Sequence, residues 1–575
     1  MRPPGPLRAS PPARAGRGPL LWSLMALAVA ALVLLPILSV IWIALHPSEN
    51  IWPHLLRTTL PRYLGNTLLL MAGVSVLSAL IGTGAAWLIT MYRFPASRAL
   101  GWMLLLPLSI PAYVGAYALV DLLEYAGPVQ SALRNLLGWQ SARDYWFPQI
   151  RSRGGAIVVL TAALYPYVYL LARTAFCEQS GNTYEAARAL GAGPWGRFLR
   201  LGLPLARPAI AAGMAIVMME TVSDFGTVDF FAVQTLTTGI FTVWLESNNA
   251  GGAAQIAGVI LILVLVLLGI ERGSRRRQEY HNAVRDPRPV VPVRLCGWRG
   301  WLATALCLFP FLVGFVLPGG VILLHALANA ERWQDPALLQ ALLNTLWVGG
   351  WAAVTTIITA LLLVYGVRLG LTRLPRLLLP VTTIGYAAPG AVLAVGVLLP
   401  LAAFDNWLAN LVLMATGTDP GLILTGSAAA VIYAYCVRFF AIAQGAVDTG
   451  MERIPPSLPM AARSLGRTAT GTLRAVHMPL IRGSVLTGLL LVFVDCVKEL
   501  PATLLLRPFN FNTLATRVYD AASLENIGEA APAAVLVILV GLAAVVLLTR
   551  NLGRTIPADA APKEGTGLAR TRAKA

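Results

Sequence analysis

The sequence predicts an all-α, polytopic membrane protein with about twelve transmembrane helices, arranged as two parallel six-helix repeats. Three observations lead to this fold class. The 575 residues are 57% hydrophobic and only 12% charged, which is too apolar for a soluble protein of this size. About twelve runs reach the roughly 20 apolar residues that a helix needs to cross a bilayer. Landmarks in the first half recur in the second half at a nearly constant offset, which indicates a duplication.

The predicted spans follow one another along the whole chain. They cover approximately residues 21–46, 67–91, 99–121, 155–176, 207–231, 253–271, 300–325, 342–367, 376–402, 423–446, 482–505 and 533–549. The apolar runs are continuous rather than alternating, which favours helices over the strands of a barrel. Pro380 and Pro389 interrupt the ninth run, so we expect a kink there.

The net charge of +18 would suit a nucleic-acid-binding protein, but the basic residues lie mainly in loops between the spans. We therefore expect no nucleic-acid partner and a lipid bilayer around the chain. With twelve spans, the basic leader, the basic central segment and the basic tail lie on one side, and the positive-inside rule makes that side cytoplasmic. Segment 122–153 fits this rule poorly because it carries four arginines on the outer side; Glu124 and Asp144 could pair with some of them.

The duplication divides the chain into five parts: a basic, disordered leader (1–20), a first domain (21–271), a charged linker with three prolines (272–299), a second domain (300–549) and a basic tail (550–575). Each domain holds six spans in the same orientation, so the repeat is parallel, about an axis along the membrane normal. The landmarks that pair at an offset of 278 are Asn66 with Asn344 and Pro111 with Pro389, and those at 275 are Glu220 with Asp495, Asp224 with Glu499 and Trp244 with Tyr519.

Two polar and basic stretches, one late in each domain, interrupt the apolar sequence. They are EAARALGAGPWGRFLRLGLP (185–204) and MAARSLGRTATGTLRAVHMP (460–479). Each contains a glycine, Gly191 or Gly466, that can adopt the left-handed conformation in which helices end. Pro194 suits the first turn of a following helix. Each stretch is therefore predicted to form two short helices that are broken at the glycine.

The two stretches differ at their first residue. In the first, Asn182 is expected to cap the helix and Glu185, three residues later, to complete a capping box. Met460 stands in the place of that glutamate, so Ser457 can cap the second helix but the reciprocal bond is lost. Such a loss costs about 0.5–1 kcal/mol.

The first stretch resembles the cytoplasmic EAA loop of ABC-importer permeases, the segment that docks on an ATPase subunit. The resemblance implies an EAA loop at 182–204 and an EAA-like loop at 457–479, each binding one ATPase. The implied docking residues are Glu185, Ala186, Ala187, Gly191, Phe198, Leu201, Pro204, Ala461, Ala462, Gly466, Leu473 and Pro479. An ordinary amphipathic surface helix is the alternative, and the second occurrence of the stretch argues against it.

Acidic residues lie inside the fifth and eleventh predicted spans. Glu220 and Asp224 are four residues apart and hence on one helix face, and Asp495 and Glu499 repeat this spacing. An ionised carboxylate inside a membrane costs several kcal/mol unless it meets water or a partner. The four acids therefore predict a hydrated path for cations between the domains, in which Lys498 could pair with Asp495 or regulate passage. The alternative is a purely structural role for each acid.

The segments around these acids, METVSDFGTVDFFAVQTLTTGIFTVW (219–244) and DCVKELPATLLLRPFNFNTLATRVY (495–519), resemble those of ferric-iron permeases. These are fused, two-copy subunits of binding-protein-dependent iron(III) importers, and the resemblance covers nearly the whole chain. It implies the type I ABC importer permease fold, a bacterial inner membrane with both termini cytoplasmic, two ABC ATPase subunits that hydrolyse ATP, and a periplasmic iron-binding protein. The implied substrate pathway is lined by Glu220, Asp224, Asp495, Lys498 and Glu499. Permeases for thiamine, polyamines or sulfate share this architecture and stay open.

The sequence lacks the Gly-x-x-x-x-Gly-Lys-Ser/Thr motif that cradles phosphates, so ATP hydrolysis is assigned to a separate subunit. The chain itself is not expected to be an enzyme or to need a cofactor, and no metal site is firmly assigned because its five histidines are scattered. A twelve-helix secondary transporter, a scaffold and a channel are the remaining alternatives. None of these needs two cytoplasmic loops that are broken at a glycine.

Overall fold

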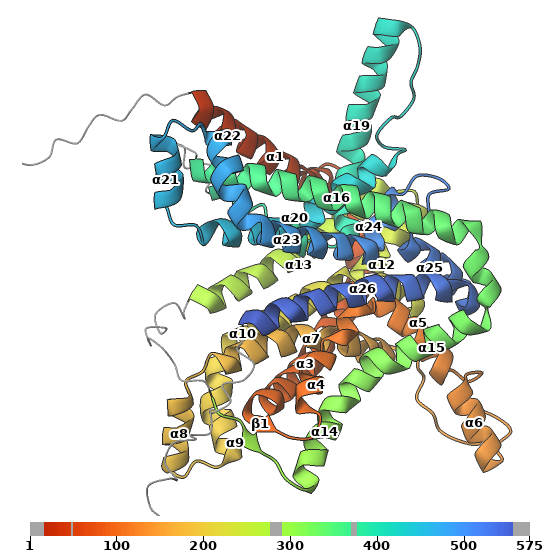
Figure 1. Ribbon diagram of the computed structural model, residues 1–575. Helices are drawn as coiled ribbons and strands as arrows, with labels where there is room; N and C mark the ends of the chain where they lie inside the picture. The colour runs from red at the N-terminus through yellow and green to blue at the C-terminus, as the bar shows by residue number, and fades with distance from the viewer. Residues whose placement is uncertain (1–16, 48–49, 277–289, 370–376, 556–575) are drawn as a thin grey trace, which may run out of the picture.

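The computed structural model describes residues 17–47, 50–276, 290–369 and 377–555, and Figure 1 shows them as a bundle of long helices. Eleven helices of the described residues are long and apolar enough to cross a membrane. A twelfth candidate is a bent pair, Ser97–Ser109 with Ala112–Leu137, whose parts meet at 94°. These helices confirm the predicted all-α membrane fold. Most of the leader, the middle of the linker and most of the tail lie outside the described residues.

The first copy comprises the described residues 17–276. Its elements are α1 (Arg17–Leu45), α2 (Trp52–Arg57), α3 (Leu60–Met91), β1 (Tyr92–Arg93), α4 (Ser97–Met103), η1 (Leu106–Ser109), α5 (Ala112–Leu123), α6 (Pro128–Leu137), α7 (Arg153–Cys177), α8 (Gly181–Ala189), α9 (Pro194–Arg197), η2 (Phe198–Gly202), α10 (Leu203–Ser223), α11 (Gly226–Phe230), α12 (Leu236–Phe241), η3 (Thr242–Glu246) and α13 (Ala250–Arg276).

The second copy comprises the described residues 290–555. Its elements are β2 (Val293–Arg294), α14 (Trp298–Phe311), η4 (Leu312–Val316), α15 (Leu317–Ala328), η5 (Ala330–Gln334), α16 (Pro336–Leu369), α18 (Ile384–Ala387), α19 (Gly390–Thr416), α20 (Ala428–Glu452), α21 (Ser457–Ser464), α22 (Ala469–Thr472), η6 (Leu473–His477), α23 (Met478–Lys498), α24 (Pro501–Leu506), α25 (Leu514–Ser523) and α26 (Ile527–Thr555).

The two copies repeat individual polar contacts. The Asn66 side chain donates to the Gln234 carbonyl at 2.8 Å, and that of Asn344 donates to the Asn512 carbonyl at 2.9 Å. Thr235 and Thr513 each form a capping box at the start of the following helix. These contacts correspond at an offset of 278, so Tyr519 corresponds to Phe241. The predicted pairing of Trp244 with Tyr519 is therefore wrong. The segment from Glu499 to Thr513 is three residues longer than the segment from Asp224 to Thr235, and this shifts the correspondence of the residues that follow.

The first long helix of each copy packs against the other copy. Trp22 of α1 meets Tyr365 of α16 edge to face at 4.9 Å, and the Tyr433 hydroxyl of α20 donates to a carbonyl of α1. In the reverse direction, Thr304 of α14 donates to the Pro95 carbonyl at 2.8 Å. Figure 1 shows α1 beside α16, and α14 beside α3 and α4. The two sequence repeats therefore do not pack as separate structural units.

Several predicted boundaries need correction. Helix α1 begins at Arg17, so residues 17–20 do not belong to a disordered leader, and α13 continues into the predicted linker as far as Arg276. Further along that linker, β2 pairs in parallel with β1. The ninth span is broken as expected: Pro389 precedes α19, whereas Pro380 lies in the turns before α18. Pro111 breaks the third span in the same way before α5.

Candidate functional site

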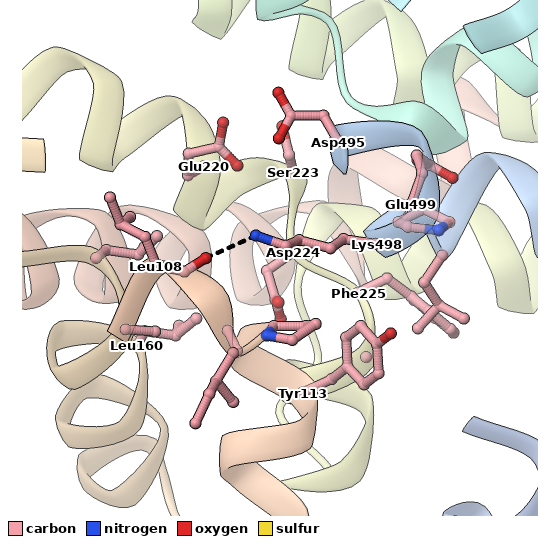
Figure 2. A pocket seen from close by; sticks show the side chains of 18 of the residues that line it. Leu108, Tyr113, Leu160, Glu220, Ser223, Asp224, Phe225, Asp495, Lys498 and Glu499 are labelled. Carbon is pink, nitrogen blue, oxygen red and sulfur yellow. Dashed lines mark hydrogen bonds between the residues drawn. The ribbon is translucent and has the colours of Figure 1, made fainter. Parts of the chain in front are cut away.

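A cavity of about 170 Å³ lies between the two copies and is lined by residues of both. Figure 2 shows the acidic and basic side chains around this space. All five residues predicted for a pathway line it, namely Glu220, Asp224, Asp495, Lys498 and Glu499. Tyr113, Tyr167, Tyr386 and Arg438 also line it, and sequence reasoning missed these four. The structure thus brings the four acids to one cavity, while their role in transport stays a prediction.

Asp224 lies just beyond the end of α10 and holds the start of α11. Its carboxylate accepts hydrogen bonds from the backbone N–H groups of Thr227 at 2.9 Å and Val228 at 3.3 Å. It also accepts one from the Thr227 hydroxyl at 3.0 Å. A side chain in this position satisfies donors that a helix start otherwise leaves unpaired. Helix α10 ends at Ser223, yet the N–H of Asp224 still bonds to the Glu220 carbonyl at 3.0 Å, and both residues line the cavity.

Glu499 does the same in the second copy. It follows α23 and accepts the backbone N–H groups of Ala502 at 3.1 Å and Thr503 at 3.3 Å. Helix α23 breaks at Glu499, so Asp495 lies inside the helix and Glu499 just after it, and both acids line the cavity. A proline at position 501, which suits the first turn of a new helix, is the sequence signal that could have revealed this break.

The cavity also contains two basic side chains, both from the second copy. Arg438 of α20 lies 3.4 Å from Glu499, between its Nη1 and Oε1 atoms; the exposed side-chain fractions are 13% and 1%. Lys498 donates to the Leu108 carbonyl of η1 at 2.7 Å, the dashed line in Figure 2. This bond crosses between the copies, and Asp495, the partner that the sequence suggested, also interacts electrostatically with Lys498. An arginine inside an apolar span is itself a functional signal, and it was overlooked in the tenth predicted span.

The first copy lacks counterparts to these cations. The N-caps Ser152 of α7 and Ser427 of α20 correspond at an offset of 275, so Ala163 occupies the place of Arg438. By the same offset, Ser223 occupies the place of Lys498. The cavity is therefore acidic on both sides but basic only on the side of the second copy.

The two loops that interrupt the apolar sequence have the predicted broken-helix form. Gly191 follows α8 with φ of 79°, and Gly466 follows α21 with φ of 82°. The residue after each glycine makes the same backbone hydrogen bond in both loops. The N–H of Ala192 donates to the Ala187 carbonyl at 2.9 Å, and the N–H of Arg467 donates to the Ala462 carbonyl at 3.1 Å. Both loops lie at the same end of the bundle in Figure 1.

The predicted caps of these loops are wrong. Helix α8 begins at Gly181, so Asn182 lies within it, and α21 begins at Ser457 with Pro456 before it. Neither helix has a side-chain capping bond, because each begins earlier along the chain than the capping pattern implied. The expected cost of Met460 at the second cap therefore has no structural basis.

The implied docking residues divide into exposed and partly buried groups. The exposed ones are Glu185, Ala186, Gly191, Pro204, Ala461, Gly466 and Pro479. Ala187, Phe198, Leu201, Ala462 and Leu473 are half-buried. Phe198 packs on Trp87 at 5.0 Å between ring centroids, so it anchors the loop to the bundle. Leu190 and Leu465, which were not predicted, are more than four-fifths exposed at corresponding places just before the glycines.

Each loop is joined directly to the acid cavity. A single run of helix leads from Pro194 through η2 to Ser223, and a corresponding run leads from Ala469 through η6 to Lys498. Asp224 and Glu499 follow the last residues of these runs. Each loop and the cavity acid that follows it therefore lie at the two ends of one run of helix.

The chain resembles known transport proteins over most of its length. Residues 78–278 match the family described as binding-protein-dependent transport system inner membrane component. An Fe(3+)-transport system permease protein of Haemophilus influenzae is 26% identical over 84% of this chain and 89% of its own length. A putative ferric transport system permease protein of the same species is 24% identical over 81% of this chain and 72% of its own. A sulfate transport system permease protein of Escherichia coli is 28% identical over 35% of this chain and 72% of its own. The chain is thus similar over most of its length to permeases of binding-protein-dependent transport systems, and its two copies of one membrane unit enclose a shared cavity.

Proposed function

We propose that this permease carries iron(III) across a bacterial inner membrane, driven by ATP hydrolysis in a separate ATPase. The observation that carries the proposal is the cavity between the copies, lined by Glu220, Asp224, Asp495 and Glu499. Oxygen-rich carboxylates suit a hard cation, and the relatives that match most of the chain are named as ferric permeases. Permeation also requires attraction that admits an ion and still releases it.

The two broken-helix loops are the proposed docking sites for two ATPase subunits. Their glycine breaks and exposed leucines correspond between the copies, and each loop continues into the helix that ends at a cavity acid. This connection supports a direct mechanical route from ATP hydrolysis to the cavity. The end of the bundle that holds both loops is assigned to the cytoplasm, and a periplasmic iron-binding protein is assigned to the opposite end.

The test neutralises the two acids of the first copy, because Glu499 is also held by Arg438. Glu220→Gln combined with Asp224→Asn keeps the shapes of both side chains and removes their charge. We expect ATP-dependent uptake of radiolabelled iron(III) to fall at least about tenfold, the effect of losing roughly 1.4 kcal/mol of attraction. The matched control, Glu246→Gln combined with Glu331→Gln, removes two charges from exposed positions outside the cavity.

Uptake is compared at equal amounts of membrane-inserted permease with the ATPase bound. Iron uptake at the parent rate in the cavity variant would assign the acids a structural role. A secondary transporter would instead lose uptake on addition of an uncoupler and keep it after ATP is removed. This result would overturn the assignment of both loops.

A further inference from the structure

We infer that the cavity takes iron(III) together with a small oxyanion, whose negative charge faces Arg438 and Lys498 of the second copy. The inference rests on the proposed function and names the chemical form of its substrate. Its starting observation is the mixed charge of the cavity, which contains four carboxylates and two basic side chains. Removing an ion from water costs several kcal/mol, and a path for bare cations gains nothing from buried cations.

Arg438 has bonding capacity to spare. Its Nη1 is buried and has no hydrogen-bond partner in the described part of the chain, although Glu499 lies 3.4 Å away. The Glu499 carboxylate is already engaged by the start of α24. A buried donor without a partner costs about 1–3 kcal/mol, and a guanidinium group matches the geometry of carboxylate and phosphate oxygens. An oxyanion in the cavity would supply the missing acceptor.

Tyr113 gives a second, independent indication. Its side chain is buried, its hydroxyl has no hydrogen-bond partner among the described residues, and it lines the same cavity. A phenol can donate to an oxyanion oxygen. Figure 2 places Tyr113 on the opposite side of the cavity from Glu220 and Asp495. The free donors thus come from both copies, as expected for a ligand held between them.

The acids alone do not form a metal site. In the ranges that the structure describes, no three His, Cys, Asp or Glu side chains are grouped closely enough to hold a metal ion. An accompanying oxyanion would fill coordination positions that the protein leaves open and would lower the net charge that crosses the membrane. The volume of about 170 Å³ is more than ten times the roughly 10–15 Å³ that one water needs on the same measure. The cavity therefore has room for a metal and a small anion.

The arrangement of charges determines how the metal and the anion are oriented in the cavity. The first copy presents Glu220 and Asp224 with Ala163 and Ser223 in the places of the cations, so it is the metal-facing side. The anion-facing donors are Arg438, Lys498, which reaches across to Leu108 of the first copy, and the hydroxyl of Tyr113. Phosphate and a carboxylate such as citrate share the required chemistry.

The experiment measures metal and anion together. The permease, its ATPase and its binding protein are reconstituted in liposomes and supplied with ⁵⁵Fe(III) and either [³²P]phosphate or [¹⁴C]citrate. We expect one of the anions to enter in about equal amount with iron when ATP is present, and neither to enter without ATP. Entry of iron without either anion would overturn the inference and leave the proposed function standing. Failure of iron to enter at all would overturn the proposed function and the inference with it.

Two variants test the assigned residues. Lys498→Met removes one cation, and Arg438→Met combined with Glu499→Gln removes the other without leaving its partner charge unpaired. Each should lower the joint entry of iron and anion at least about tenfold, whereas Arg438→Lys, which keeps a cation, should retain more than Arg438→Met with Glu499→Gln. Joint entry at the parent rate in both charge-removing variants would overturn the roles of Arg438 and Lys498. Glu246→Gln serves as the control for the loss of an exposed charge.

Discussion

Asp224 and Glu499 stand at corresponding places in the two copies, and they share a backbone role while their surroundings differ. Each follows a long helix that begins at a loop, and each accepts backbone N–H groups of the next short helix. In the first copy, Ala163 and Ser223 stand in the places of Arg438 and Lys498. In the second copy, Arg438 lies 3.4 Å from Glu499, and Lys498 reaches across to the Leu108 carbonyl of the first copy.

The residue at a third position also differs between the two copies. Gly390 begins α19, and a side-chain Cβ there would collide with Glu499 Oε1 and Arg438 Nη1. The corresponding residue of the first copy is Ala112, beside a shorter acid with no arginine. The duplication has thus kept what the backbone needs at both places, while the charge of the cavity has diverged on one side.

The largest effect is expected from breaking either loop. Gly191→Pro or Gly466→Pro should lower ATP-dependent uptake at least about tenfold, because proline fixes φ near −65° and the two glycines have φ of 79° and 82°. The substitution also removes an N–H that bonds to Arg188 or Arg463. Uptake and ATPase copurification are measured at equal amounts of inserted permease.

Gly193→Pro is the matched control for the first loop. Its φ is already −66°, and its ψ of 172° suits a residue before Pro194. This variant should keep uptake near the parent rate. If Gly191→Pro and Gly466→Pro transport normally, the loops do not couple ATP hydrolysis to transport. If only one of them fails, the two loops are not equivalent.

The next prediction compares how much Glu499 and Asp224 each contribute to the free energy of unfolding. Glu499→Gln leaves Arg438 buried without its partner charge and should lower the free energy of unfolding by about 3–5 kcal/mol. Asp224→Asn leaves no buried charge unpaired, and the new amide oxygen can still accept a hydrogen bond from Thr227. This substitution should therefore lower the free energy of unfolding by less than about 1 kcal/mol. Unfolding of the detergent-solubilised protein by denaturant measures both. Equal losses would contradict the charge difference between the two places.

The sequence predicted the spans, the duplication and the glycine breaks because these depend on local composition and backbone conformation. It did not predict that α10 ends at Ser223, since the apolar run continues beyond it and the capping contact of Asp224 decides the boundary. Nor did it predict that α1 packs on the second copy, because apolar helix surfaces resemble one another in sequence. Arg438 was missed although its place within an apolar run is a usable signal.

A smaller effect is expected at the position that accommodates the ion pair. Gly390→Ala should lower the free energy of unfolding by about 1–3 kcal/mol, the usual range for overpacking, because its Cβ meets both partners of the pair. The control is Ala112→Gly in the first copy, which removes a methyl group at the corresponding place and should cost no more than about 1 kcal/mol. If the two substitutions cost the same, the ion pair does not determine the glycine.

The smallest effect is expected at Met460, where the two loops differ most visibly in sequence. A glutamate at this position has no capping partner, because Met460 is 61% exposed within α21 and no side chain caps that helix. The free energy of unfolding should therefore change by less than about 0.5 kcal/mol, as for most surface substitutions, and Glu185→Met should change it equally little. A gain of about 1 kcal/mol in Met460→Glu would restore the capping explanation. If ATPase affinity changes while stability does not, the difference between the two loops lies in direct contact with the ATPase, and the exposed side chain at this position is part of the docking surface.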